Sequence, residues 1–225
     1  TIKSFCHAFR GDKNPPALVL KTSSAGFSVM DRENISKRID ELTKEFGKDC
    51  PPIYLLHGQL SEHQMAGLYN HSKIKAMVSF THGEGFGRPL LEFSLTGKPV
   101  IASNWSGHLD FLKSGAVLLD GELKDVHPSA QNQFILQGSK WFYVNYTGAI
   151  KTLTDIYRKY DTYKSSASKL GKRNQKPDNS FADPKEFGWI HLPSVISVFD
   201  CLVSDSEAGS YSFYDFCDNF GYDKD

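Results

Sequence analysis

At residues 81–92 the chain reads THGEGFGRPLLE, and this stretch indicates both a fold and a binding site. An apolar run over residues 75–80 leads into it, and a helix is expected to begin at Arg88. A strand, a glycine turn and a helix N-terminus in succession are typical of α/β proteins that hold phosphate groups. Glycines let the backbone N–H groups approach the anion, and the helix dipole favours its negative charge.

Two carboxylates flank this glycine turn. Glu84 and Glu92 are eight positions apart, with Gly85, Phe86 and Gly87 between them. Phosphate alone would not require acids here, whereas sugar hydroxyls donate hydrogen bonds to carboxylates. The stretch therefore predicts a ligand that joins a diphosphate to sugars.

Strand and helix patterns alternate through the first 120 residues. Short apolar runs predict strands over residues 17–22, 52–57, 75–80, 98–103 and 116–120. Apolar spacing of three and four residues, with capping signals such as Ser61 to Gln64, predicts helices over residues 2–10, 34–46, from Ser61 onward, 88–96 and 107–113. This alternation predicts an α/β fold with a doubly wound, Rossmann-like parallel sheet and additional C-terminal helices.

Cationic and imidazole side chains stand where such a sheet binds its ligands, at the carboxyl ends of the strands. Lys21 and His57 each end an expected strand, and Arg88 begins the helix after the glycine turn. We expect Lys21 and Arg88 to supply positive charge to a diphosphate, although Lys21 could simply end its strand. His57 is either part of a base pocket or a buried structural histidine.

The pattern changes after Gly121. Residues 122–145 look irregular, and helices are expected over residues 147–159, 161–171 and 184–203. Residues 204–225 form an acidic, aromatic tail, which we expect to dock on this chain or on an absent partner domain. We therefore expect one donor-binding domain over residues 1–203, followed by the tail.

The composition excludes several classes of protein. The 225 residues contain 26 Lys and Arg against 26 Asp and Glu, which argues against a broad surface for nucleic acid. No apolar run approaches the roughly 20 residues that span a bilayer. The four cysteines form no CxxC pair, and the histidines have neither HxH nor HxxxH spacing, so no metal site is expected. We expect a cytoplasmic protein, with peripheral attachment to a membrane left open.

The stretch from Glu84 to Glu92 resembles the E-x7-E motif of retaining GT-B glycosyltransferases of the family 4, or group 1, type. That family includes bacterial mannosyltransferases and sucrose synthases. Four further segments resemble the same family in the same order: a glycine turn at 57–62, a helix end at 68–69, a strand at 97–103 and a small-residue turn at 106–110. The resemblance is close over residues 1–120 and looser to about residue 200.

The resemblance implies that the chain is the C-terminal, nucleotide-sugar-binding half of such an enzyme. It implies that Glu84 binds hydroxyls of the transferred sugar, which makes it the candidate catalytic residue. The amides of Gly85, Phe86 and Gly87 would hold the diphosphate and the sugar. Glu92 would bind the ribose diol of the nucleotide.

The resemblance also implies what lies outside this chain. An N-terminal half would bind the acceptor, which could be a glycan, a lipid or a small molecule. The family's Arg and Lys for the diphosphate precede the helix expected over residues 2–10, and the chain begins after that point. We therefore expect the chain to bind a nucleotide sugar without a metal or organic cofactor, and to transfer the sugar poorly by itself.

Two alternatives stay open at this point. A nucleotide-sugar epimerase of GT-B architecture would need further acid–base residues in the missing half, and the E-x7-E pattern argues against it. A non-catalytic module that binds nucleotide sugars would have the same residues in this chain.

Overall fold

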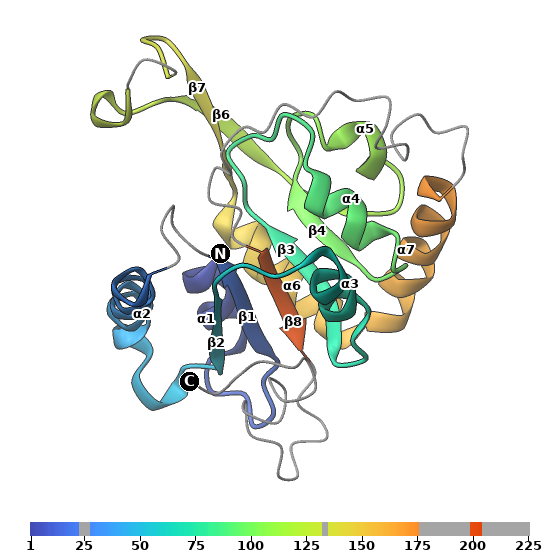
Figure 1. The fold of residues 1–225 in the computed structure, drawn as a ribbon, viewed down its shortest axis with the longest axis horizontal. Helices are drawn as coiled ribbons and strands as arrows, with labels where there is room; N and C mark the ends of the chain where they lie inside the picture. Colours follow the sequence, from blue (N-terminus) through green and yellow to red (C-terminus); the bar gives the residue numbers. More distant parts are fainter. Residues whose placement is uncertain (23–27, 132–134, 176–198, 204–225) are drawn as a thin grey trace. The chain divides into compact units, whose positions relative to one another are not determined.

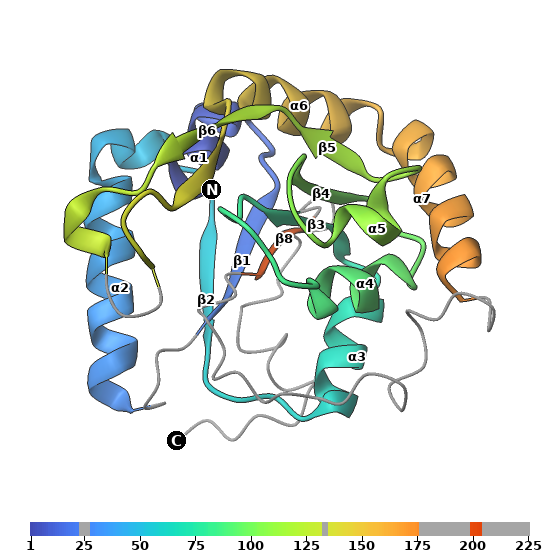
Figure 2. The same cartoon turned by 90° about the horizontal axis from the view of Figure 1, so that it is seen from above.

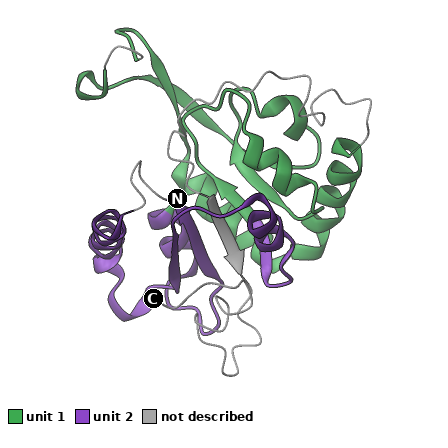
Figure 3. Cartoon of the chain, in the orientation of Figure 1, with its two compact units in different colours: residues 1, 77–188 green, residues 2–76, 189–225 purple. Residues whose placement is uncertain are grey.

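The computed structural model of the chain describes residues 1–22, 28–131, 135–175 and, for the backbone alone, 199–203. The expected tail over 204–225 and the first part of the expected final helix lie outside the described residues. The chain divides into two compact units, residues 2–76 with 189–225 and residues 77–188 with Thr1, and the boundary falls inside strand β3 (Figure 3). Each unit is described by itself.

The unit that contains residues 2–76 is built on parallel strands. Strand β1 (Ala17–Thr22) pairs in parallel with β2 (Ile53–His57), with Leu20 opposite Leu55. Its other edge pairs with β8 (Phe199–Val203), which runs antiparallel. The helices of this unit are α1 (Ile2–Phe9), α2 (Val29–Thr43), a 3-10 helix (Lys44–Asp49) and α3 (Glu62–Asn70).

Local sequence explains where these helices begin. The hydroxyl of Ser28 accepts a hydrogen bond from the Asp31 amide, so α2 starts five residues before the predicted 34–46. At α3 the predicted capping box is confirmed, because Ser61 and Gln64 bond to each other's backbone N–H groups. The core of this unit consists of apolar side chains from α1, β1 and their neighbours: Phe5, Cys6, Phe9, Leu18, Leu20, Phe46 and Leu56.

The other unit also contains parallel strands. Strand β4 (Val100–Ser103) pairs in parallel with β3 (Ile74–Ser79) on one side and with β5 (Val117–Leu119) on the other (Figure 1). Its helices are α4 (Arg88–Ser94), α5 (Leu109–Leu112), α6 (Tyr146–Arg158), α7 (Tyr160–Asn174) and a 3-10 helix (Pro128–Ala130). Figure 2 shows α6 and α7 following each other along the outer side of this unit. The predicted α/β architecture with parallel strands is confirmed.

Two segments differ from the prediction. Residues 122–145, expected to be irregular, contain an antiparallel ribbon of β6 (Gly121–Asp125) and β7 (Lys140–Val144), which extends away from β3–β5 (Figure 1). Phe199–Val203, expected to end a helix, forms strand β8. The strands in both segments form by pairing with another strand of the chain, and local apolar spacing does not encode such pairing.

Candidate functional site

The glycine turn lies directly after β3, as its sequence predicts. Gly87 precedes α4 with a left-handed φ of 83°, and a Cβ there would lie 3.0 Å from the Cβ of His108. The backbone conformation therefore favours glycine at this position, and the space beside it is tight. The ring of Phe86 packs against that of Phe111, with centroids 5.3 Å apart, which leaves the loop's role to its backbone and to Glu84.

Glu84 is half-buried in this loop. Burial raises the pKa of its carboxyl, while a hydrogen bond from Thr81 and the electrostatic effect of the nearby His108 ring act in the opposite direction. A carboxylate whose ionised form has lost part of its hydration gains more from hydrogen-bond donors than an exposed one does. The position therefore suits recognition of ligand hydroxyls.

The backbone of Glu84 is held by the turn after β4. The Ser106 hydroxyl accepts a hydrogen bond from the Glu84 amide at 3.0 Å and donates one to the Glu84 carbonyl at 2.5 Å. The Gly107 amide donates to the same carbonyl at 3.1 Å. The small-residue turn over residues 106–110 therefore contacts the backbone of Glu84, whose carboxylate is the candidate ligand-binding group.

Arg88 and Glu92 lie one helical turn apart on α4 and form an ion pair. The Arg88 Nε is 2.5 Å from a Glu92 carboxylate oxygen, and their side chains are 50% and 38% exposed. Arg88 is the first residue of α4 and follows the glycine turn directly, while Glu92 lies one turn further along the helix, and both side chains are accessible to solvent. The predicted roles of Arg88 toward a diphosphate and of Glu92 toward a ribose stay predictions.

His108 is fully buried beneath the glycine turn. Its Nε2 is 2.7 Å from the Ser103 carbonyl, to which it donates in the matching tautomer. The Nδ1 is buried and has no hydrogen-bond partner in the described part of the chain. A Cβ at position 87 would lie only 3.0 Å from the His108 Cβ, so His108 packs closely against the glycine turn.

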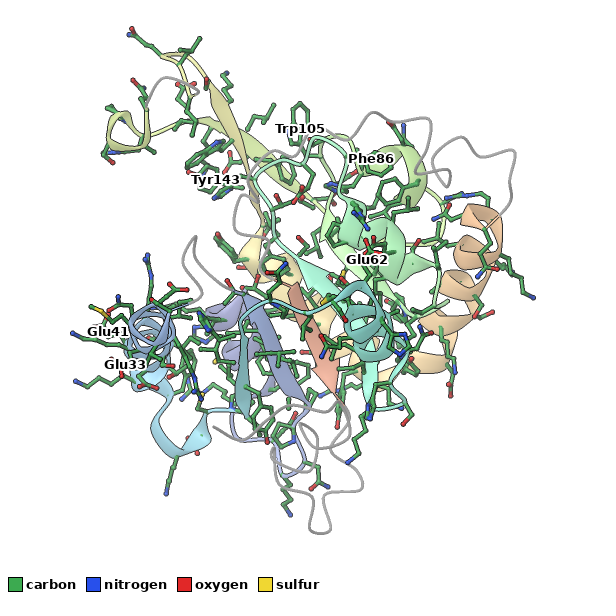
Figure 4. The ribbon with its side chains drawn as sticks, in the orientation of Figure 1. Glu33, Glu41, Glu62, Phe86, Trp105 and Tyr143 are labelled. Atoms are coloured by element: carbon green, nitrogen blue, oxygen red, sulfur yellow. The ribbon has the colours of Figure 1, made fainter. Side chains whose placement is uncertain are left out.

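An aromatic cluster adjoins the loop on the side of the β6–β7 ribbon. The ring of His82 stacks on that of Trp141, with centroids 4.9 Å apart, and its centroid is 4.6 Å from that of Tyr143. The His82 Nδ1 is 2.7 Å from the Phe142 carbonyl oxygen. Trp105, labelled in Figure 4, is 41% exposed, and its ring is nearly parallel to that of Phe142, with centroids 6.2 Å apart. The sequence did not predict this cluster, because the ribbon segment appeared irregular.

Lys21 and His57 belong to the unit that contains residues 2–76. The Lys21 ammonium donates a hydrogen bond to the Gly58 carbonyl, and burial lowers its pKa. His57 Nε2 is 2.8 Å from an Asp31 carboxylate oxygen, and both side chains are about nine-tenths buried. Asp31 was not predicted, and the grouping of Lys21 and His57 with Glu84 stays a prediction.

Comparison with known protein families gives a match that includes residues of both units. Residues 53–135 match the family model for glycosyl transferases group 1. The matched segment contains Glu84, Glu92 and the Ser106–Gly107 turn, and it supports a transferase that moves a sugar from a donor to an acceptor. No curated protein matches the chain. None of the described helices is both long enough and apolar enough to cross a membrane.

Proposed function

We propose that the chain is the donor-binding domain of a retaining GT-B glycosyltransferase, an enzyme that transfers a sugar from a nucleoside diphosphate to a hydroxyl acceptor. The observation that carries the proposal is the half-buried Glu84 carboxylate within the segment that matches group 1 glycosyltransferases. A second carboxylate, Glu92, stands further along the same segment, on α4. Donor binding extends in this proposal over residues 1–203.

In this proposal each group acts on one part of the donor. Glu84 accepts hydrogen bonds from hydroxyls of the transferred sugar, and Glu92 accepts them from the ribose. The amides of Gly85, Phe86 and Gly87, together with Arg88 and Lys21, stabilise the diphosphate as it departs, and His57 lines the base pocket. Catalysis by positioning and by fixed donors of this kind needs no protein nucleophile.

The acceptor is a glycan, a lipid or a small molecule, which an N-terminal half would bind. Binding of the donor is proposed to be independent of metal ions. A cytoplasmic location fits the two described thiols, since Cys6 and Cys50 are free although their sulfur atoms are 3.8 Å apart.

Calorimetric titration tests the proposal directly. The chain would be titrated with UDP, GDP and ADP and with their glucose and mannose conjugates, with and without Mg²⁺. We expect one base to bind, its sugar conjugate to bind more tightly, and Mg²⁺ to change neither affinity. Equal affinity for a nucleotide and all of its sugar conjugates would contradict the assignment of Glu84. Failure of every nucleotide to bind would contradict the donor-binding function of this chain.

A further inference from the structure

Ser106 has a backbone conformation that serine rarely adopts. Its φ is 86°, and it is the one non-glycine residue with positive φ in the described part of the chain. This region is unfavourable for residues with a Cβ, and glycine would occupy it without strain. A strained serine at a loop that contacts a candidate site indicates that its hydroxyl has a use.

The use is visible in the hydrogen bonds of that hydroxyl. It accepts from the amide of Glu84 at 3.0 Å and donates to the carbonyl of the same residue at 2.5 Å. One side chain thus engages both polar backbone groups of a residue 22 positions earlier in the sequence. The peptide planes on both sides of Glu84 are fixed as a result.

Gly107 completes the arrangement by allowing close contact. Its amide donates to the Glu84 carbonyl at 3.1 Å. A Cβ on Gly107 would lie 2.0 Å from the Gly85 carbonyl oxygen, so no side chain fits between the two loops. The segment from Glu84 to Gly85 therefore lies directly against Ser106 and Gly107.

We infer that Ser106 is a positioning residue that determines sugar specificity by holding the Glu84 backbone. The inference rests on the proposed function, because it concerns how Glu84 recognises a sugar. A carboxylate that distinguishes one hydroxyl orientation from another must be held to within about 0.5 Å. With its backbone fixed, the Glu84 side chain has only its own torsions left, so its oxygens reach a restricted set of positions.

The test is Ser106→Gly, which removes the hydroxyl and also relieves the strained φ. The variant should be folded and at least as resistant to urea as the wild type. In titrations with UDP, GDP and ADP and their glucose and mannose conjugates, the preference for the tighter-binding sugar nucleotide over its bare nucleotide should fall roughly tenfold. The affinity for the bare nucleotide should not change. An unchanged preference in a folded variant overturns the inference.

Thr96→Ala is the matched control within the same unit. The Thr96 hydroxyl also makes two backbone hydrogen bonds, to the Phe93 carbonyl at 2.7 Å and from the Lys98 amide at 3.2 Å. Its loss should leave the sugar preference at the wild-type value. An equal loss of preference in Thr96→Ala would assign the effect to general loosening of the unit and overturn the role of Ser106.

Hydrogen exchange separates this inference from the proposed function. The Glu84 amide should be protected in the wild-type chain and exchange faster in Ser106→Gly, with no nucleotide present. A Glu84 amide that is unprotected in the wild type overturns the backbone contact itself. A protected amide in a chain that binds no nucleotide sugar refutes the proposed function, and the specificity role with it.

Discussion

Glu84 and Glu92 differ in what surrounds their carboxylates, and this difference determines what each substitution should do. Glu84 is half-buried and its pKa is raised by burial, whereas the exposed Glu92 has the guanidinium of Arg88 beside it. Removing the Glu84 carboxylate eliminates a partly desolvated charge. Removing the Glu92 carboxylate takes away the ion-pair partner of Arg88. The two residues should therefore be separable by binding measurements.

We expect Glu84→Ala to remove the preference for a sugar nucleotide over the bare nucleotide, and Glu92→Ala to weaken binding of the nucleotide itself. Each change should cost about 1–3 kcal/mol of binding free energy, since each removes an acceptor for ligand hydroxyls. Titration calorimetry with both ligands measures the two effects. Glu41→Ala, an exposed carboxylate on α2 (Figure 4), is the control and should change neither affinity. Wild-type affinities in both site variants would refute the assignment.

The raised pKa of Glu84 makes stability depend on pH. The folded protein holds this proton to a higher pH than the unfolded chain, whose glutamates titrate near 4.3. Between the unfolded and folded pKa values the folded state binds more protons, so the free energy of unfolding falls as pH rises through that window. Below this pH window the protonated Glu84 does not change the free energy of unfolding. Above the window the ionised Glu84 lowers it by a constant amount.

Glu84→Gln should therefore become more stable relative to the wild type as pH rises. Urea unfolding of both proteins at pH 4 and pH 7 measures this difference. The gain in the free energy of unfolding should be larger at pH 7 than at pH 4. A difference that is the same at both values would show that burial does not perturb this carboxyl.

The sequence could predict the candidate side chains better than their supports. Glu84 and Glu92 could be predicted because acids beside a glycine turn indicate a ligand with hydroxyl groups. The contact between Ser106 and Glu84 joins two loops at the ends of different strands, and no spacing in the sequence encodes it. The pairing of Asp31 with His57 could not be predicted for the same reason, because only folding brings the two residues together.

At the scale of elements, α4 and α7 pack closely because a glycine lies between them. A Cβ on Gly171 would meet the Ser94 carbonyl oxygen at 2.8 Å and the backbone of Gly97 at 3.2–3.3 Å. We expect Gly171→Ala to lower the free energy of unfolding by about 1–3 kcal/mol, because α7 must shift to admit a methyl group. Thermal and urea denaturation measure the loss.

Gly148→Ala is the matched control for this helix contact. Gly148 lies in the first turn of α6, and the three atoms nearest to a Cβ there belong to the Asn145 side chain, at 3.6–3.9 Å, which is ordinary van der Waals contact. Alanine should be tolerated or stabilise by at most about 1 kcal/mol, through its higher helix propensity. Similar losses in the two variants would mean that close packing of α7 on α4 is not the cause.

Elements with strong local signals were predictable, and those formed by pairing were not. The expected strand at 98–103 appears as Val100–Ser103, and the expected helix at 161–171 as Tyr160–Asn174. Strand β6 has the sequence GELKD, and all five of its residues are exposed, so it has no apolar alternation that would predict a strand. The apolar run of β8 is too short for its periodicity to distinguish a strand from a helix.

At the scale of the whole molecule, β8 pairs with a strand near the start of the chain. Ala17 lies opposite Val203 and Lys21 opposite Phe199. A chain that ends at residue 198 should lose this ladder, so the β1 amides that pair with β8 should exchange with solvent roughly tenfold faster. The amides of β4, which pairs with β3 and β5, should be unaffected. Hydrogen exchange resolved by NMR or by mass spectrometry reports both.

A chain that ends at residue 203 is the control, because it keeps β8 and lacks only residues 204–225. It should protect β1 as the 225-residue chain does. If both shortened chains lose protection of β1 equally, residues 204–225 and not β8 would be responsible.

The pairing of β1 with β8 also constrains the order of events during synthesis on the ribosome. Strands β4 to β7 find their described partners close by in sequence, so they can pair while translation continues. The nascent β1 must wait until residues 23–203 have been made before its second neighbour, β8, is available. During that interval one edge of β1 is open to strands of other molecules, and a chaperone that shields this edge would prevent such pairing.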